Sequence, residues 1–342
     1  RKTDPFMQYA YIAAEEAMKQ SGIKIEPERT GIVMGTAMAG IATIAYTQEA
    51  LTGASHKKVG PRFIPKILGN IAAANIAIDY NIQGPSFTVS TACSSGGDAI
   101  NTACMCMQSG KADIMLAVGA ESVLCPLVIY SLANAKALSR RNDSPSTASR
   151  PFDVTRDGFV IGEGGGALVL ETEEHALARG AKIYAEIRGC GNTDDAYHVT
   201  APHPEGRGAI ACMKQAIAEA GINPSDIGYI NAHGTATNKG DTVETSSIKK
   251  VFGNTLPYVS STKGATGHMM GAGGITETIT CVKAIETGTV PPTINLNEVD
   301  PECAGIDFVA NTAKKAEINF AMSNAFGFGG QNSSIIVGKY GK

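Results

Sequence analysis

The sequence lacks long apolar runs and an excess of basic residues, and both absences exclude classes of protein. No stretch reaches the roughly 18 consecutive apolar residues that a membrane-spanning helix needs. The N-terminal stretch RKTDPFMQYAYIAAEEAM carries charges where a secretory signal would have its apolar core. The formal net charge of −3 and the pI near 6.1 leave no basic footprint typical of nucleic-acid binding. We therefore expect a soluble, intracellular protein that neither inserts into membranes nor binds nucleic acid.

Cysteine pairs at the spacing of metal or redox motifs are also missing. The chain has eight cysteines but no Cys-x-x-Cys pair, and without an export signal we expect reduced thiols. Cys104 and Cys106 lie two residues apart, which on a helix places them on different faces. That spacing argues against a metal clamp, so we expect no metal site here.

The first half of the sequence contains a repeated alternation of strands and helices. A chain of 342 residues, 43% of them hydrophobic, can bury one large or two ordinary domain cores. Apolar residues at helical spacing over 6–21 are followed by strands at RTGIVMG, FTVST, ADIMLAVGAES and GGGALVLET, with a helix over 95–109. The polar, turn-rich segment 131–158 is predicted to be a long surface excursion.

The same pattern restarts after about residue 180. Strands are expected at KIYAEIRGCG, IGYINAHG and PYVSSTKG, near 306–310 and over 333–338, and helices over 207–220, 240–252 and 271–287. We therefore predict a duplicated, layered α/β fold whose halves are residues 1–180 and 181–342. Periodicity alone does not establish the order of the strands.

Cys93 draws attention because small residues surround it. In TVSTACSSGGDAI a short strand leads through a tight turn into a helix, which places the thiol at a helix N-terminus. A free thiol has a pKa of about 8.5, and we expect this position to lower the pKa and make the sulfur nucleophilic. The small neighbours Ala92, Ser94, Ser95 and Gly96 would leave room for a substrate carbonyl. A buried, inert cysteine is the alternative.

Two histidines and an acid–base pair strengthen the catalytic interpretation. His233 follows the strand IGYINA, and His268 lies in STKGATGHMMGAGG, so each stands at a strand end where α/β sheets carry reactive side chains. Each alone could simply hold a loop, but together with Cys93 they favour catalysis. Lys263 and Glu277 flank His268, and we expect them to pair, because a carboxylate in a Gly/Ala-rich helix needs a partner. A purely structural ion pair remains open.

Five ordered motifs resemble those of the β-ketoacyl-acyl carrier protein synthases, the elongating condensing enzymes of dissociated fatty acid synthesis. They are TACSSGG, NAHGTATNKGD, STKGATGHMMGAGG, PPTINL and SNAFGFGGQN, and the resemblance covers essentially the whole chain. It implies a thiolase-like fold of five αβαβα layers, usually in a homodimer. It also implies an acyltransferase that condenses malonyl-acyl carrier protein with a cysteine-bound acyl chain, with loss of CO₂ and with no metal or redox cofactor.

The resemblance assigns roles to individual residues. Cys93 is the implied acyl-accepting nucleophile, and His233 and His268 the implied pair at the malonyl thioester carbonyl. Lys263 and Glu277 are the implied supporting charges. The further implied site residues are the gate Phe328, whose backbone N–H joins that of Cys93 in an oxyanion hole, the substrate contacts Thr235, Thr237 and Phe326, the chain-length residue Met38, and the docking residues Lys57, Lys58 and Lys136 for an acidic carrier protein. Taken alone, each of these lysines is more readily explained as an ordinary solvated charge.

One departure from the family pattern concerns the start of the sequence. Family members have a strand and about 60 to 70 further residues before the match to RKTDPFMQYA, and loss of that strand would leave a sheet edge unpaired. We expect either a fragment of a longer protein or another segment over that edge.

Three other functions remain open: a polyketide ketosynthase, a non-catalytic partner that binds carrier protein and acyl chains, and a cysteine hydrolase. The compartment is either the bacterial cytoplasm or the plastid stroma, and the preferred chain length is not determined.

Overall fold

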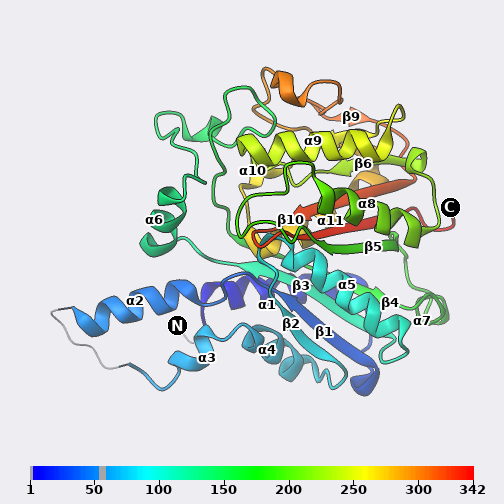
Figure 1. The fold of residues 1–342 in the computed structure, drawn as a ribbon. Helices are drawn as coiled ribbons and strands as arrows, with labels where there is room; N and C mark the ends of the chain where they lie inside the picture. The colour runs from blue at the N-terminus through cyan, green and yellow to red at the C-terminus, as the bar shows by residue number, and fades with distance from the viewer. Residues whose placement is uncertain (1–2, 54–58) are drawn as a thin grey trace.

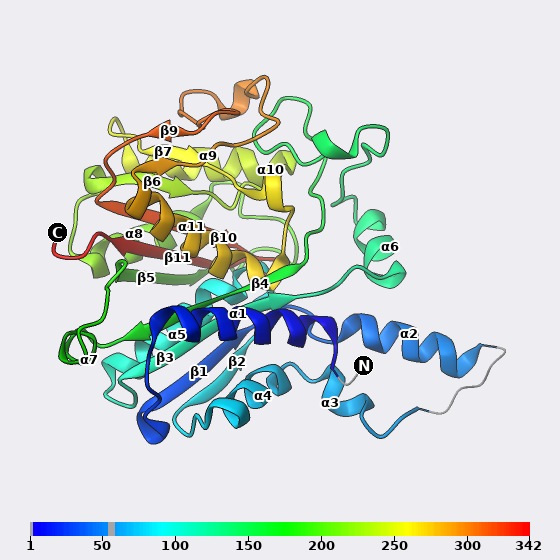
Figure 2. The ribbon, with the colours of Figure 1, turned by 180° about the vertical axis from the view of Figure 1, so that it is seen from behind.

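Two large β-sheets and three helical layers make up most of the described structure. The computed structural model describes residues 3–53 and 59–342. Helices α1 (Pro5–Ser21) and α4 (Asn70–Tyr80) cover the outer face of one sheet, and α8 (Arg207–Ala220) and α9 (Asn238–Phe252) lie outside the other (Figures 1 and 2). Between the sheets lie α5 (Ser95–Gln108) and α11 (Gly273–Thr287). This is the expected thiolase-like arrangement of five layers.

The first sheet has the strand order β2 (Ser86–Val89), β1 (Thr30–Gly35), β3 (Ile114–Glu121) and β4 (Gly164–Glu171). The first three strands are parallel, and β4 runs antiparallel to β3. Every residue of β1 and β3 is buried, because helices cover both faces of the sheet. Strands that are buried on both faces need side chains without charge on both sides, and this explains the mostly apolar sequences of β1 and β3.

The second sheet repeats this order and adds one strand. Its order is β7 (Tyr258–Ser260), β6 (Ile227–Asn231), β10 (Phe320–Phe326), β11 (Gln331–Gly338) and β5 (Glu186–Asp194). Again three parallel strands are followed by antiparallel pairs. Strands β7-β6-β10-β11 thus match β2-β1-β3-β4, whereas β5 has no counterpart beside β4 among the described residues.

The remaining elements are short or lie at the edges of the two sheets. The α-helices are α2 (Ile41–Thr52), α3 (Phe63–Ile67), α6 (Pro126–Asn134), α7 (Glu173–Ala178) and α10 (Lys263–Thr266), and β8 (Thr289–Val290) pairs with β9 (Lys314–Lys315). Single 3₁₀ turns lie at Pro27–Arg29, Ala92–Ser94, Pro145–Thr147, Pro224–Asp226, Met270–Ala272 and Pro301–Cys303. Within the described ranges, none of the helices is both long and apolar enough to cross a bilayer.

Glycines allow the two central helices to touch backbone to backbone. A Cβ on Gly96 would lie 2.7 Å from the amide nitrogen of Ile275, and one on Gly274 would lie 2.5 Å from that of Gly97. Any side chain at these positions would push α5 and α11 apart. Cys93 lies just before α5, and His268 lies a few residues before α11. The contact between the helices therefore also fixes how far apart these two segments lie.

One expected strand does not form, and one strand of the fold was not predicted. Residues 306–310 form no strand; Ala310 makes only an isolated bridge to Thr293. The central strand β10, in contrast, was not predicted, because its sequence FAMSNAF mixes polar and apolar residues although six of its seven positions are buried. Its polar side chains are satisfied inside the fold: Asn324, for example, accepts a hydrogen bond from the Ser334 hydroxyl.

The segment 131–158 is also not simply a surface excursion. Its first residues belong to α6, and both Phe152 and Arg156 are buried. The guanidinium of Arg156 pairs with Asp241 at 3.4 Å and with Asp300 at 2.5 Å. A polar sequence therefore reaches the interior, because its charge finds partners there.

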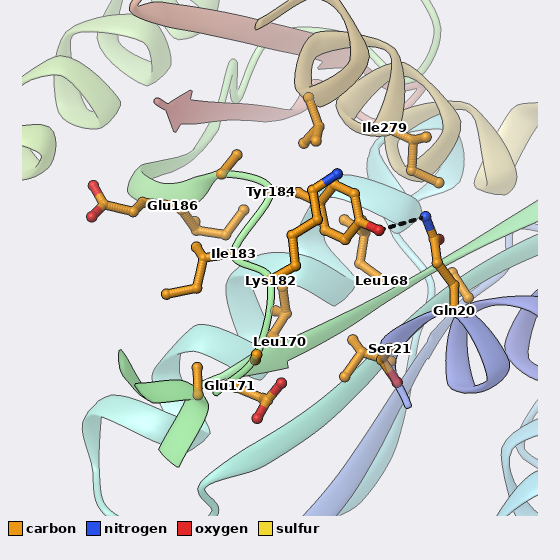
Figure 3. A pocket seen from close by; sticks show the side chains of 18 of the residues that line it. Gln20, Ser21, Leu168, Leu170, Glu171, Lys182, Ile183, Tyr184, Glu186 and Ile279 are labelled. Carbon is orange, nitrogen blue, oxygen red and sulfur yellow. Dashed lines mark hydrogen bonds between the residues drawn. The ribbon is translucent and has the colours of Figure 1, made fainter. Parts of the chain in front are cut away.

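A cavity of about 870 Å³ lies along β4, away from the reactive centre described below. Figure 3 shows Leu168 and Leu170 of β4 facing Ile279 of α11 across it, near Tyr184, whose hydroxyl accepts a hydrogen bond from Gln20. Of the described strands, only β3 pairs with β4, so the other edge of β4 faces this cavity.

Candidate active site

Three side chains that are remote in sequence meet at the ends of β2, β6 and α11. The Cys93 sulfur and one ring nitrogen from each of His233 and His268 lie within 4.8 Å of one another. The closest contact joins His268 Nε2 to Cys93 Sγ at 3.1 Å. The two imidazole rings stand edge to face, with centroids 5.3 Å apart. The fold thus brings together the thiol and both imidazoles.

The turn that presents Cys93 is built by its small neighbours. Ala92 adopts a left-handed conformation with φ of 51°, which is strained for a residue with a Cβ. The Ser95 hydroxyl accepts from the Thr91 amide and donates to the Ala92 carbonyl, and the Ser94 hydroxyl donates to Asp98. Both serines are fully buried, so their hydroxyls hold the turn in place.

The prediction of a lowered thiol pKa was wrong. Burial raises the pKa of Cys93 to about 11, although the Phe328 backbone N–H, which donates to the sulfur, and the charge of Lys263 both lower it. Loss of water around the thiolate therefore outweighs the helix N-terminus. In the resting protein Cys93 is a thiol, and a nearby base must remove its proton before it can react.

Both histidines are neutral at ordinary pH. Burial lowers the pKa of His233 and His268 well below the usual value, and the charge of Lys263 lowers both further. The backbone of His268 is fixed by a hydrogen bond from its N–H to the Val160 carbonyl, at 2.7 Å. A neutral imidazole can both accept a proton from a thiol and donate an N–H to an oxygen.

Lys263 and Glu277 form a buried ion pair beside these rings. Their side chains are 2% and 5% exposed, and Glu277 Oε1 accepts from the Lys263 ammonium. Burial raises the pKa of Glu277, and Lys263 opposes that rise. Since Lys263 also influences Cys93 and both histidines, the pair sets the electrostatic potential of the whole site.

Two acidic residues of α9 escaped the sequence analysis. Glu244 accepts from the backbone N–H groups of His233 and Gly234 at 2.8 and 2.7 Å, and burial raises its pKa to about 7. Asp241 accepts from the N–H groups of Phe152 and Ala236, and burial raises its pKa to about 6. Their spacing of three residues places both carboxylates on the buried face of α9, and that pattern could have revealed them.

The other expected site residues surround this centre to different degrees. The Phe326 ring lies 6.0 Å from that of His233, and Phe328 is 38% exposed while its backbone faces the sulfur. The hydroxyls of Thr235 and Thr237 are hydrogen-bonded to each other at 3.0 Å. Met38 packs against the apolar cluster that contains Cys93.

Of the three expected docking lysines, only Lys136 lies within the described residues. Lys57 and Lys58 lie outside the described residues. Lys136 is exposed just after α6, with φ of 56°.

The thiol and imidazole donors are also of the type that binds Zn²⁺, which requires a thiolate and neutral histidines. A cation held there would occupy the sulfur that acyl transfer needs.

Comparison with known proteins identifies the family to which this geometry corresponds. The model described as "Beta-ketoacyl synthase, N-terminal domain" matches residues 1–176, and "Beta-ketoacyl synthase, C-terminal domain" matches residues 184–297. The chain is 45% identical to "3-oxoacyl-[acyl-carrier-protein] synthase 2" of Rhizobium meliloti, over 99% of this chain and 82% of that protein. It is 44% identical to the protein of the same name from Coxiella burnetii, over 99% and 83%.

A solved structure shares the fold at lower sequence identity. It is described as "type II PKS acyl-carrier protein in complex with its ketosynthase bound to the hexaketide". The TM-score is 0.91 at 34% identity, and the match covers 99% of this chain and 85% of that chain. The chain therefore resembles the two synthases of Rhizobium and Coxiella more closely in sequence than it resembles this polyketide ketosynthase.

Proposed function

The chain belongs to the beta-ketoacyl synthase family, and from this membership we infer that it is an elongating 3-oxoacyl-[acyl-carrier-protein] synthase of fatty acid biosynthesis. It is an acyltransferase of the condensing type. The observation that carries the mechanism is the meeting of one thiol with two neutral imidazoles within 4.8 Å. A thiol and a single base would suffice for hydrolysis, whereas condensation also requires donors for an enolate.

We propose that acyl transfer comes first. His268 Nε2, 3.1 Å from the sulfur, takes the proton of Cys93 as the sulfur attacks the acyl thioester. The backbone N–H groups of Cys93 and Phe328 are the proposed donors to the tetrahedral oxyanion. The intermediate expels the carrier-protein thiolate, which recovers the proton from His268. His268 is then neutral again for the second step.

The second step, as we propose it, is decarboxylation of the malonyl thioester. His233 and His268 donate N–H groups to the thioester oxygen, the bond to the carboxylate breaks, and CO₂ leaves with an enolate behind it. For this step His268 must carry its proton on Nε2, the atom that accepted the thiol proton in the first step, so the mechanism requires a change of tautomer between the two steps. The enolate carbon attacks the acyl group on Cys93, and the sulfur departs as a thiolate. This thiolate takes up one proton from solvent, which is the proton that loss of CO₂ from a carboxylate consumes. Neutral imidazoles suit this role because they stabilise the oxyanion without protonating the nucleophilic carbon.

We propose that the acyl and malonyl groups arrive on acyl carrier protein and that the enzyme is a homodimer. The solved complex of a ketosynthase with its acyl-carrier protein supports the first of these. One edge of β2 pairs with no other described strand, and Phe87 there is 48% exposed. Together with the 70% exposed Tyr130 of α6, this edge supports an interface between copies. Residues 1–180 and 181–342 are the proposed halves, and the bacterial cytoplasm is the proposed compartment, since the curated relatives compared above are bacterial.

The decisive experiment is incubation with malonyl-acyl carrier protein and acyl carrier proteins that bear a ladder of acyl chains. Mass analysis should find β-ketoacyl products two carbons longer than each accepted primer. Release of free fatty acid without a new carbon–carbon bond would support a hydrolase. Binding without acylation of Cys93 would support a non-catalytic partner, and repeated extension without reduction would favour polyketide synthesis.

A further inference from the structure

One buried carboxylate near Cys93 has no part in the mechanism above. Glu121 ends β3 and is fully buried. Its Oε1 accepts from the Thr36 hydroxyl at 3.0 Å and from the Met38 N–H at 3.1 Å. Its Oε2 accepts from the Ala37 N–H at 2.6 Å and from the Gly271 N–H at 3.1 Å. Four donors therefore converge on one side chain.

These donors come from two separate backbone segments. Residues 36–38 form the turn after β1, and Gly271 lies in the 3₁₀ turn between His268 and α11. A Cβ on Gly271 would lie 2.5 Å from the Ala37 amide nitrogen and 2.7 Å from Glu121 Oε2. The two segments are therefore in close contact beside the carboxylate.

Both segments also form walls of the apolar cluster around the nucleophile. Met270 belongs to the cluster with Cys93, and Met38 packs against it together with Ile41. If the proposed function is correct, an acyl group on the sulfur borders this cluster, so the positions of Met38 and Met270 bear directly on the room available to it.

The charge of Glu121 does not favour the reaction. Its presence raises the pKa of the Cys93 thiol, so it opposes formation of the thiolate. A carboxylate retained so close to a thiol nucleophile must contribute something other than activation. The four hydrogen bonds indicate that its contribution is geometric.

We propose that Glu121 is a positioning residue that fixes the Met38 turn and thereby sets the length of acyl chain that Cys93 accepts. The proposal rests on the proposed condensing function. It concerns only the acyl pocket, and it predicts no direct part for Glu121 in decarboxylation.

The pattern of donors makes Glu121→Gln an informative variant. A glutamine has one accepting oxygen and one donating NH₂ group. The NH₂ group must therefore replace one carboxylate oxygen and face the two donors that had bonded to that oxygen. The Thr36 hydroxyl can rotate and accept, whereas the Ala37 and Gly271 N–H groups cannot. The amide will therefore turn toward Thr36 and Met38, which keeps the Gly271 anchor and leaves the Met38 N–H without its acceptor.

The test measures acylation of Cys93 by intact mass with a ladder of acyl-carrier proteins, and malonyl decarboxylation without any acyl primer. In Glu121→Gln we expect the ratio of kcat/KM for the longest and shortest accepted chains to change about fivefold, the effect of one hydrogen bond. Decarboxylation should remain within about twofold, since the Gly271 contact is kept. A fall of equal size for every chain length would overturn the proposal.

A control carboxylate ends the neighbouring strand. Glu171 is the last residue of β4, and its Oε1 accepts from Arg179 Nε at 2.8 Å. Neither residue belongs to the apolar cluster around Cys93. Glu171→Gln also removes one carboxylate charge and should leave the chain-length profile unchanged. If Glu121→Gln unfolds, Glu121→Asp, which keeps the charge and shortens the reach, must shift the profile instead. A wild type that forms no β-ketoacyl product would count against the proposed function, not against the role of Glu121.

Discussion

Removal of the buried ammonium of Lys263 should separate its structural role from its electrostatic one. A methionine at this position would retain most of the side-chain volume but would leave Glu277, 5% exposed, without a cation. Breaking a buried ion pair on one side costs about 3 to 5 kcal/mol. Lys263→Met should therefore unfold at a temperature lower by about 4 to 7 °C, because an unfolding entropy of about 2.1 cal/mol/K per residue gives about 1.4 °C per kcal/mol for 342 residues.

The double variant Lys263→Met with Glu277→Met is the control for that cost. Replacing both partners by apolar side chains of similar volume is often neutral for stability, so the double variant should unfold near the wild-type temperature. It will not recover the electrostatics of the site, because Lys263 lowers the pKa of Cys93, His233 and His268. We expect it to be stable but slow in condensation.

The assay is the rate of Cys93 alkylation by iodoacetamide, followed by mass at several pH values, beside thermal unfolding. Without Lys263 the pKa of Cys93 should rise above its wild-type value of about 11, so alkylation at alkaline pH should be slower in both variants. The reasoning fails if Lys263→Met unfolds at the wild-type temperature. It also fails if the alkylation profile of the double variant coincides with that of the wild type.

Three further predictions concern the same centre. His233→Ala should retain acylation of Cys93 but slow decarboxylation by about 10²- to 10³-fold, whereas His268→Ala should lose both steps. Transfer of a radiolabelled acyl group measures the first step, and CO₂ release measures the second. Intact acylation in His268→Ala would contradict the proposed proton transfer. Burial raises the pKa of Glu244 from 4.5 to about 7, so the folded state binds this proton more tightly than the unfolded state does. The resulting stability is fully present below pH 4.5 and is lost as the pH rises toward 7. Glu244→Gln should flatten that decline in unfolding temperature between pH 5 and 7, and an unchanged slope would show that this proton is not the cause. A chelator should leave condensation by dialysed enzyme unchanged while added Zn²⁺ inhibits it, because the thiol and imidazole donors lie within 4.8 Å; activity that a chelator abolishes would refute this.

Local pattern accounts for much of the fold. The continuous apolar sequences of β1 and β3 and the helical spacing in α8 follow from burial on two faces or on one, so these elements were predictable. Strand β10 was not, since its asparagine and serine are compatible with a central strand only because partners such as Ser334 lie opposite them. The same holds for Arg156, whose burial depends on Asp241 and Asp300.

The sequence by itself determined which residue types stand at the ends of its strands, and so which side chains were candidates for chemistry. Only the tertiary structure decided that Cys93 and His268, 175 residues apart, lie in contact. It also decided that the thiol is protonated at rest, because desolvation depends on everything packed around the sulfur, while a helix N-terminus can be recognised locally. The surroundings of the Glu121 and Glu244 carboxylates were also decided only by the tertiary structure. Most of their partners are backbone N–H groups, which nearly every residue has and which no sequence motif marks.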